Sequence, residues 1–88
     1  MEINPSEYKI LIVDDVISNV LLLKVLLTNE KFSIATASNG GQALAQVDKE
    51  NPDLVLLDVM MPDMSGFEVA QRLKSNPETA EIPIIFLT

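Results

Sequence analysis

Runs of apolar residues alternate with mixed segments along the chain, and the alternation predicts a repeated strand–helix order. Unbroken apolar runs of strand length fall within residues 9–13, 54–57 and 82–88, while residues 32–37 alternate apolar and polar positions. Continuous apolar runs are typical of strands that are buried on both faces of a parallel sheet. The pattern therefore predicts an α/β fold, with a parallel sheet covered by helices on both faces.

Three helices are expected between the strands. The first spans residues 18–29, with Ser18 as its cap, and is apolar on nearly all of its faces. The second opens at residues 38–41 and runs to residue 50. The third begins where Ser65 and Glu68 have the spacing of a capping box, and it ends before Pro77. Residues 1–8 are polar and are expected to form a loose segment, and residues 1–88 to form a single domain.

Acidic residues follow two of the predicted strands. Asp14 and Asp15 come directly after the first apolar run, and Asp58 comes directly after the third. Asp58 alone could simply lead the chain into solvent, but in open α/β sheets ligands bind beyond the carboxyl ends of the strands. If the three acids share one site, the first and third strands are neighbours, which predicts the strand order 2-1-3-4. Right-handed crossovers then place the first helix alone on one face of the sheet and the other two on the opposite face.

Three carboxylates in one crevice favour a bound cation. Two unit charges about 4 Å apart repel by roughly 4 kcal/mol at an effective dielectric constant of 20. Oxygen ligands without His or Cys indicate a hard ion, and Mg²⁺ is the abundant one. Since Mg²⁺ usually keeps waters and binds a phosphate oxygen, a phosphorylated ligand is expected. Thr88 ends its strand at the same edge, where its hydroxyl either donates to a phosphoryl oxygen or has no special role.

Composition narrows the classes of function. The chain has 13 acidic and 6 basic residues, a net charge of −7, which disfavours direct binding of nucleic acid. It contains no Cys and no His, so thiol chemistry, zinc–thiolate sites, the usual general base and a phosphohistidine donor are excluded. The N-terminus does not have the pattern of a signal peptide, and no apolar run approaches the roughly 20 residues that span a bilayer. A cytoplasmic protein without a membrane partner is therefore expected.

The motifs together resemble the receiver domain of two-component response regulators, in particular the chemotaxis regulators. The resemblance covers the chain from Lys9 onward, and it is carried by Ile12-Val13-Asp14-Asp15, by Leu56-Leu57-Asp58-Val59-Met60-Met61-Pro62-Asp63 with Gly66, and by Ile84-Ile85-Phe86-Leu87-Thr88. It implies a three-layer, flavodoxin-like parallel sheet. It also implies an incomplete receiver, truncated after the fourth strand, that lacks the last strand, its phosphoryl-binding lysine and the last two helices.

The resemblance implies a role for each site residue. Asp58 would be the phosphoacceptor, modified by a histidine kinase or a phosphotransfer domain. Asp15, Asp58 and the backbone carbonyl of Met60 would ligate Mg²⁺, with Asp14 acting through water. Thr88 would contact the phosphoryl group and shift on activation. The domain would not be an enzyme, but a signalling module that assists its own phosphoryl transfer and hydrolysis.

The methionine side chains and Asp63 in the loop after Asp58 are expected to support the fold rather than to bind a ligand. The side chains of Met60 and Met61 are expected to pack against apolar neighbours, because the implied role of Met60 uses only its backbone. Asp63 is expected to be a turn residue rather than a ligand.

Three alternatives compete with the phosphoacceptor. A Mg²⁺-dependent phosphatase of the haloacid dehalogenase type would resemble D-x-D-x-[TV], but no second Asp follows Asp58 at that spacing. A flavodoxin-like cofactor carrier would need a phosphate loop rich in Ser, Thr and Gly after the first strand, and residues 16–19 are a poor match. A non-phosphorylated interaction module built on the receiver fold remains, particularly for the truncated form.

The predicted topology also indicates self-association. One helix cannot cover four strands, and the fourth strand is an open apolar edge that could pair with another chain. We therefore expect the chain to associate through this edge and through the bare part of the adjacent sheet face.

Overall fold

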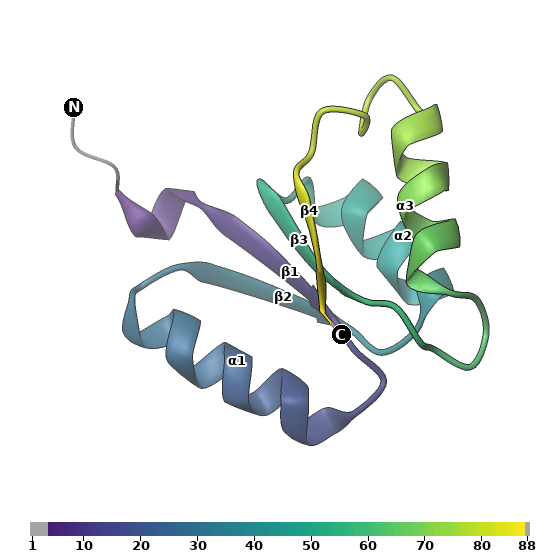
Figure 1. Ribbon diagram of the computed structural model, residues 1–88. Helices are drawn as coiled ribbons and strands as arrows, with labels where there is room; N and C mark the ends of the chain where they lie inside the picture. The colour runs from purple at the N-terminus through teal and green to yellow at the C-terminus, as the bar shows by residue number, and fades with distance from the viewer. Residues whose placement is uncertain (1–3, 88) are drawn as a thin grey trace.

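The computed structural model describes residues 4–87 and confirms the alternation of strands and helices (Figure 1). A short 3-10 turn, Pro5–Glu7, precedes the first strand. The strands are β1 (Lys9–Val13), β2 (Ser33–Ala37), β3 (Leu54–Asp58) and β4 (Ile84–Leu87). The helices are α1 (Ile17–Asn29), α2 (Gly40–Glu50) and α3 (Gly66–Ser75).

The four strands form one parallel sheet in the order β2-β1-β3-β4, as the shared acidic site requires. β1 lies in the middle, where Ile10 is opposite Ile34 on β2 and opposite Leu54 on β3. On the other side of β3, Val55 is opposite Ile84. The switch point of the sheet therefore lies between β1 and β3, where Asp14 directly follows β1 and Asp58 ends β3 at the same edge.

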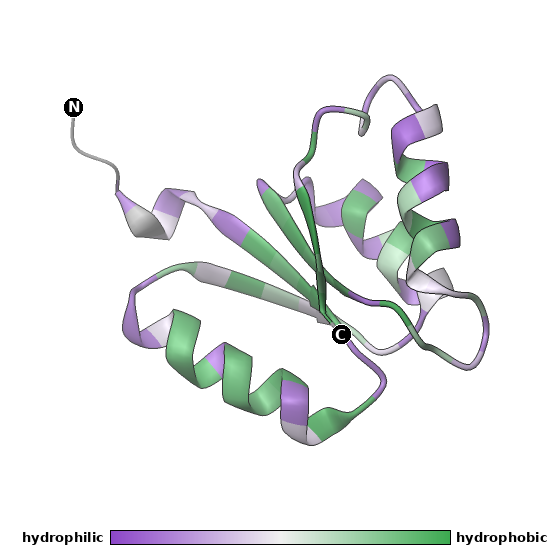
Figure 2. Cartoon of the chain, viewed as in Figure 1, coloured by the Kyte–Doolittle hydropathy of each residue, from purple (hydrophilic) through white to green (hydrophobic). Residues whose placement is uncertain are grey.

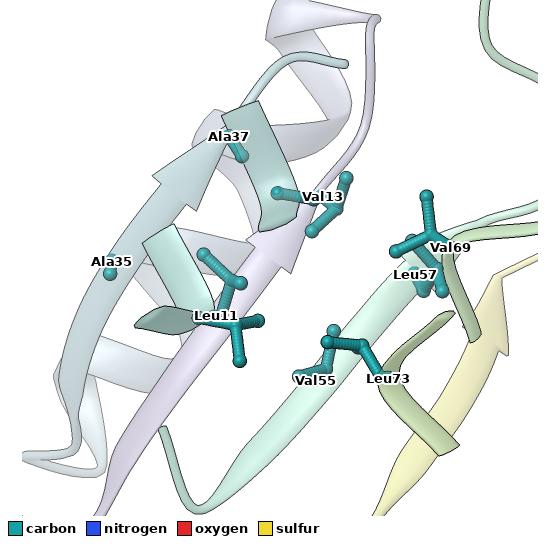
Figure 3. Packing of buried hydrophobic residues seen from close by; sticks show 10 residues of the cluster. Leu11, Val13, Ala35, Ala37, Val55, Leu57, Val69 and Leu73 are labelled. Carbon is teal, nitrogen blue, oxygen red and sulfur yellow. The ribbon is translucent and has the colours of Figure 1, made fainter. Parts of the chain in front are cut away.

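The helices cover the two faces unequally, also as predicted (Figure 1). α2 and α3 pack on one face, where Leu11, Val55 and Leu57 lie in the main core with Val69 and Leu73 of α3 (Figure 3). α1 packs alone on the opposite face, against a smaller core of three buried residues. These residues are Ile10, Ile12 and Leu56.

α1 has no fully buried residue, although its sequence is mostly apolar. Leu22 is 62% exposed and Val25 is 57% exposed, so apolar side chains cover the outer surface of the helix as well as its inner one (Figure 2). The expectation that Ser18 caps this helix was wrong. The helix begins one residue earlier, at Ile17, and the cap position is Val16, which makes no side-chain capping bond.

Two strands are shorter than the sequence pattern predicted. β2 begins at Ser33 rather than at residue 32, and β4 begins at Ile84 rather than at residue 82. Proline explains the second difference, because Pro83 has no N–H to donate and offers only its carbonyl, which accepts from Val55 N at 3.0 Å. Within residues 4–87, no helix combines the length and the apolar character that crossing a membrane requires.

Candidate functional site

Asp14, Asp15 and Asp58 converge at the carboxyl edge of the sheet. Each offers a carboxylate oxygen, and these three oxygens lie within 4.8 Å of one another. The acids follow β1 and end β3, two strands that are neighbours in the sheet, so their proximity is a direct result of the strand order. The structure therefore brings together the acids that the sequence placed in one site.

Asp14 is buried and held by the protein itself. It is only 4% exposed, and its backbone N–H donates to the Ala37 carbonyl at 3.1 Å. Its Oδ1 accepts from Val16 N at 2.9 Å, and its Oδ2 accepts from Asn19 Nδ2 at 3.2 Å. Because both oxygens already have protein donors at the start of α1, Asp14 is the member of the cluster that is least free to bind a cation directly.

Asp58 is partly buried, and its environment disfavours its charge. Burial raises the pKa of the Asp58 carboxyl above its ordinary value. The backbone N–H of Met60, which donates to Asp58 Oδ1 at 3.3 Å, offsets part of this rise, while the charges of Asp14 and Asp15 add to it. A cation bound at this edge would oppose this rise, because it favours the charged form of Asp58. Asp15 is the exposed member of the cluster and the most accessible to such a ligand.

The loop after β3 is packed closely against Asp58. Gly66, the first residue of α3, is buried, and a Cβ on it would overlap the Asp58 carbonyl. The Gly66 N–H donates to the Val59 carbonyl at 2.8 Å, and Ser65 caps the helix by accepting from Glu68 N at 3.2 Å. The capping box that the sequence predicted is thus confirmed in its Ser65 half, and it fixes where the loop ends.

The two methionines of the loop behave differently. Met61 packs against the main core, as predicted, but the prediction was wrong for Met60, whose side chain is 81% exposed. Met60 directly follows Val59, where the chain has left β3, so its side chain has no sheet neighbour to cover it. Its backbone lies close to the site, since its N–H reaches the Asp58 carboxylate.

Asp63 lies in the turn, as expected, but it also has a specific role that the sequence did not suggest. Its carboxylate accepts hydrogen bonds from the N–H groups of Gly40 and Gly41, the first two residues of α2. Bonds between residues more than 20 positions apart have no short sequence signature, which is why pattern reasoning missed them. Thr88, the expected phosphoryl contact, lies outside the described residues.

Two of the lysines are engaged elsewhere. Lys9 Nζ pairs with Glu50 at 2.9 Å, at the edge of the sheet where β1 begins. Lys74 Nζ donates to the carbonyls of Ala80 and Ile82, ahead of β4. Neither lysine contributes to the acidic edge.

A recess of about 270 Å³ opens beside the acids. Its polar lining is Asp14, Asn19 and Asp58, and its apolar lining comes from Leu22, Leu23 and Leu87. The recess therefore joins the carboxylates to the exposed apolar surface of α1, and a partner molecule could contact both at once.

The donor set fits a hard divalent cation. Three carboxylates lie close together, and the Met60 carbonyl belongs to the loop that directly follows Asp58, the last residue of β3. Mg²⁺ is bound in proteins through one or two carboxylates with several waters, which matches an accessible Asp15, a partly buried Asp58 and an Asp14 whose oxygens are already occupied.

Comparison with known proteins gives a consistent match. The family model described as "Response regulator receiver domain" matches residues 10–88. Among characterised relatives, response regulator PleD of Caulobacter vibrioides is 48% identical over 80 residues, which are 91% of this chain and 18% of that protein. Protein PilH of Pseudomonas aeruginosa is 38% identical over 80 residues, which are 91% of this chain and 66% of that protein.

Solved structures agree with the sequence matches. The N-terminal domain of a response regulator receiver protein from Methanoculleus marisnigri superposes with a TM-score of 0.90 at 40% identity, over 92% of this chain and 66% of that one. Chemotaxis response regulator CheY4 of Vibrio cholerae superposes with a TM-score of 0.86 at 33% identity, over 90% of this chain and 66% of that one. This chain therefore spans about two thirds of the length of these two structures and 18% of the length of PleD.

Proposed function

Because this chain belongs to the response regulator receiver domain family, we propose that it is the phosphoacceptor module of a two-component phosphorelay. Asp58 receives a phosphoryl group from a histidine kinase or a phosphotransfer domain in the cytoplasm. The convergence of Asp14, Asp15 and Asp58 at one edge of the sheet is the observation that supports this role most directly. As a receiver domain, the chain is a signalling module rather than an ordinary enzyme.

The proposed reaction is an in-line displacement at phosphorus. One carboxylate oxygen of Asp58 attacks the phosphoryl group of a phosphohistidine, the new O–P bond forms as the N–P bond breaks, and the imidazole nitrogen leaves with the electron pair and takes up a proton. Such transfers depend on positioning and on neutralisation of charge more than on covalent help, and a carboxylate can be the nucleophile. The Met60 N–H, 3.3 Å from Asp58 Oδ1, helps to orient the nucleophile.

Asp15, Asp58 and the Met60 carbonyl would hold Mg²⁺, and Asp14 would act through water. When bound, Mg²⁺ would neutralise charge on the carboxylates and on the incoming phosphoryl oxygens. Asp14 orients the start of α1 by accepting hydrogen bonds from Val16 and Asn19. Its charge adds to the negative potential at this edge of the sheet. In this proposal, Thr88 contacts the phosphoryl group and shifts its position on activation. By this assignment, the domain assists its own phosphoryl transfer and hydrolysis.

Phosphorylation of a complete receiver protein that contains this chain, here called the parent protein, tests the proposal. We expect a cognate histidine kinase, or a small acyl phosphate donor, to label the full-length protein and Asp48→Asn, a control on the exposed side of α2, but not Asp58→Asn. The 88-residue chain alone should label slowly or undetectably, because Lys9 bonds to Glu50 and Lys74 bonds to the Ala80 and Ile82 carbonyls, so neither of these two reaches the acidic edge. Label that persists in Asp58→Asn would refute the assignment, and an unlabelled parent protein would favour a non-phosphorylated interaction module.

A second part of the proposal is that the 88-residue chain associates with a second copy of itself. β4 is an edge strand of the described sheet, and Ile85 on the α1 side of that strand is 52% exposed. Lys24 is the only charged residue within α1, so the exposed apolar surface of this helix is nearly neutral in a chain of net charge −7. An open strand edge beside an apolar face is a surface on which a second chain can pair.

Light scattering over a range of concentrations measures this association. We expect the average mass of the 88-residue chain to rise with concentration, and Ile85→Lys, which places a charge on the edge strand, to reduce the rise. Ala45→Lys on α2 is a matched control, because it adds the same charge at an exposed position of a helix on the opposite face. A constant monomer mass at high concentration would contradict the proposal.

A further inference from the structure

We propose that Asp63 is a positioning residue for the metal-binding loop, because its carboxylate clamps residues 59–65 to the N-terminus of α2. The inference rests on the proposed function in one respect, namely that the Met60 carbonyl of this loop is a Mg²⁺ ligand. Asp63 itself is not a ligand in this proposal. It acts by limiting where the loop can lie.

The clamp is bidentate and joins two elements. Asp63 Oδ1 accepts from Gly40 N at 2.9 Å, and Asp63 Oδ2 accepts from Gly41 N at 2.9 Å. These N–H groups belong to the first turn of α2, where they have no acceptor within the helix and where the helix dipole favours a negative group. These two hydrogen bonds are the main reason that the pKa of the Asp63 carboxyl is lowered. Charged hydrogen bonds of this kind are stronger than neutral ones.

An apolar contact accompanies the clamp at the next residue. Gly40 is buried, and a Cβ on it would overlap the side chain of Met64 and lie 3.1 Å from Val69 Cγ2. Met64 is itself packed against the main core. The loop therefore meets α2 through two consecutive residues, one polar and one apolar, and a Cβ at position 40 would force the Met64 side chain to move.

Hydrogen bonds hold the loop on both sides of Met60, so the Met60 carbonyl lies in a short segment with little freedom to move. At one end, Met60 N bonds to the Asp58 carboxylate, and Gly66 N bonds to the Val59 carbonyl. At the other end, Asp63 holds the loop only three residues after Met60. Because the Met60 side chain is 81% exposed and makes little packing of its own, these anchors decide the position of its backbone.

α2 also has an ordinary cap, and this provides a matched control. The Asn39 side chain accepts from Gln42 N at 2.8 Å, so it stabilises the same helix terminus through a different N–H. Asn39 makes this bond within its own helix start and does not bond to residues 59–65. Removal of either cap should lower stability by a similar amount, but only removal of Asp63 should release the loop.

The experiment compares Asp63→Ala and Asn39→Ala with wild type and Asp15→Asn. Mg²⁺ alone is titrated by calorimetry at a temperature well below unfolding, and amide hydrogen exchange of residues 59–65 is measured without metal. We expect Asp63→Ala to weaken the Kd for Mg²⁺ by about fivefold, the factor that corresponds to one capping interaction, and to exchange faster in the loop. Asn39→Ala should lower Tm with Kd and loop exchange unchanged. If Asp63→Ala does not fold, Asp63→Asn, which keeps one acceptor oxygen, replaces it.

Asp63→Ala removes both a negative charge and a contact that positions the loop. Measuring the Mg²⁺ Kd at high salt distinguishes these two effects. Near 1 M salt the screening length is about 3 Å, so a long-range charge effect of Asp63 disappears while a positional effect persists. Equal Kd values for Asp63→Ala and wild type, a difference abolished by salt, or equal weakening in Asn39→Ala would each overturn the inference. Failure of the proposed function looks different, because wild type and Asp15→Asn would then bind Mg²⁺ equally.

Discussion

Asp15→Asn should stabilise the metal-free protein and yet weaken its response to Mg²⁺. The variant removes one charge from a cluster whose oxygens lie within 4.8 Å of one another. At that separation, each like-charge pair costs about 0.9 kcal/mol at the dielectric constant of water and about 3.5 kcal/mol at an effective value of 20. Asp15 is exposed, so the lower figure applies to each of its two pairs, with Asp14 and with Asp58, and their sum is about 1.7 kcal/mol. Screening at physiological salt, where the Debye length is about 8 Å, reduces this sum to about 1 kcal/mol, so we expect Tm to rise by roughly 4–8 °C for a domain of this size.

Mg²⁺ should reverse this order. A ligand present at 100 times its Kd stabilises the folded state by about 2.7 kcal/mol, and a tenfold weaker Kd removes about 1.3 kcal/mol of that gain. Wild type should therefore unfold at a lower temperature than Asp15→Asn without Mg²⁺ and at the same or a higher temperature once Mg²⁺ saturates the site. General screening by salt would only bring the two curves together, because it reduces a repulsion that wild type has and Asp15→Asn lacks. A crossing therefore indicates bound Mg²⁺.

Thermal unfolding at fixed ionic strength is the assay, with Na⁺ replacing Mg²⁺ in the control series. Asp48→Asn, on the exposed side of α2, is the matched charge control and should respond to Mg²⁺ as wild type does. Equal increases of Tm in wild type and Asp15→Asn would refute the metal site. A metal-free Asp15→Asn that is less stable than wild type would refute the repulsion on which the reasoning depends.

Two further predictions follow from the contacts of the loop. Gly66→Ala should lose about 1–3 kcal/mol of stability, because its Cβ would overlap the Asp58 backbone, whereas Gly41→Ala, whose Cβ would lie 3.5 Å from Asn39 Oδ1, should be close to neutral in chemical denaturation. The lowered pKa of Asp63 means that its contribution to stability is complete above the unfolded pKa of about 3.9 and is lost as pH falls through the lower folded pKa. The gap in Tm between wild type and Asp63→Asn should therefore narrow as pH is lowered below about 4, and a constant gap would contradict the role of its charge.

The fold could be predicted from sequence because its signals are local and repeat. Each apolar run marks a strand, and the acids after two of them fixed which strands are neighbours, so the order β2-β1-β3-β4 followed from chemistry as much as from pattern. The acidic site could be predicted for the same reason, since Asp14, Asp15 and Asp58 directly follow or end their strands. Errors occurred where a terminus depends on a neighbour, as at α1, whose N-terminus is fixed by Asp14 rather than by the expected cap, Ser18.

The contact between Asp63 and α2 could not be predicted, because it depends on how two loops meet at the edge of the sheet. The sequence shows a Pro-Asp pair typical of a turn and, more than 20 residues earlier, a Gly-Gly pair typical of a helix start. Only the packing of α2 beside α3 places these segments together, and each glycine then makes a tertiary contact in addition to starting the helix. Gly40 leaves room for the Met64 side chain, and the N–H of Gly41 becomes a partner for a distant carboxylate. The loop that carries the Met60 carbonyl is thus fixed by tertiary contacts, while the carboxylates beside it are placed by the strands themselves.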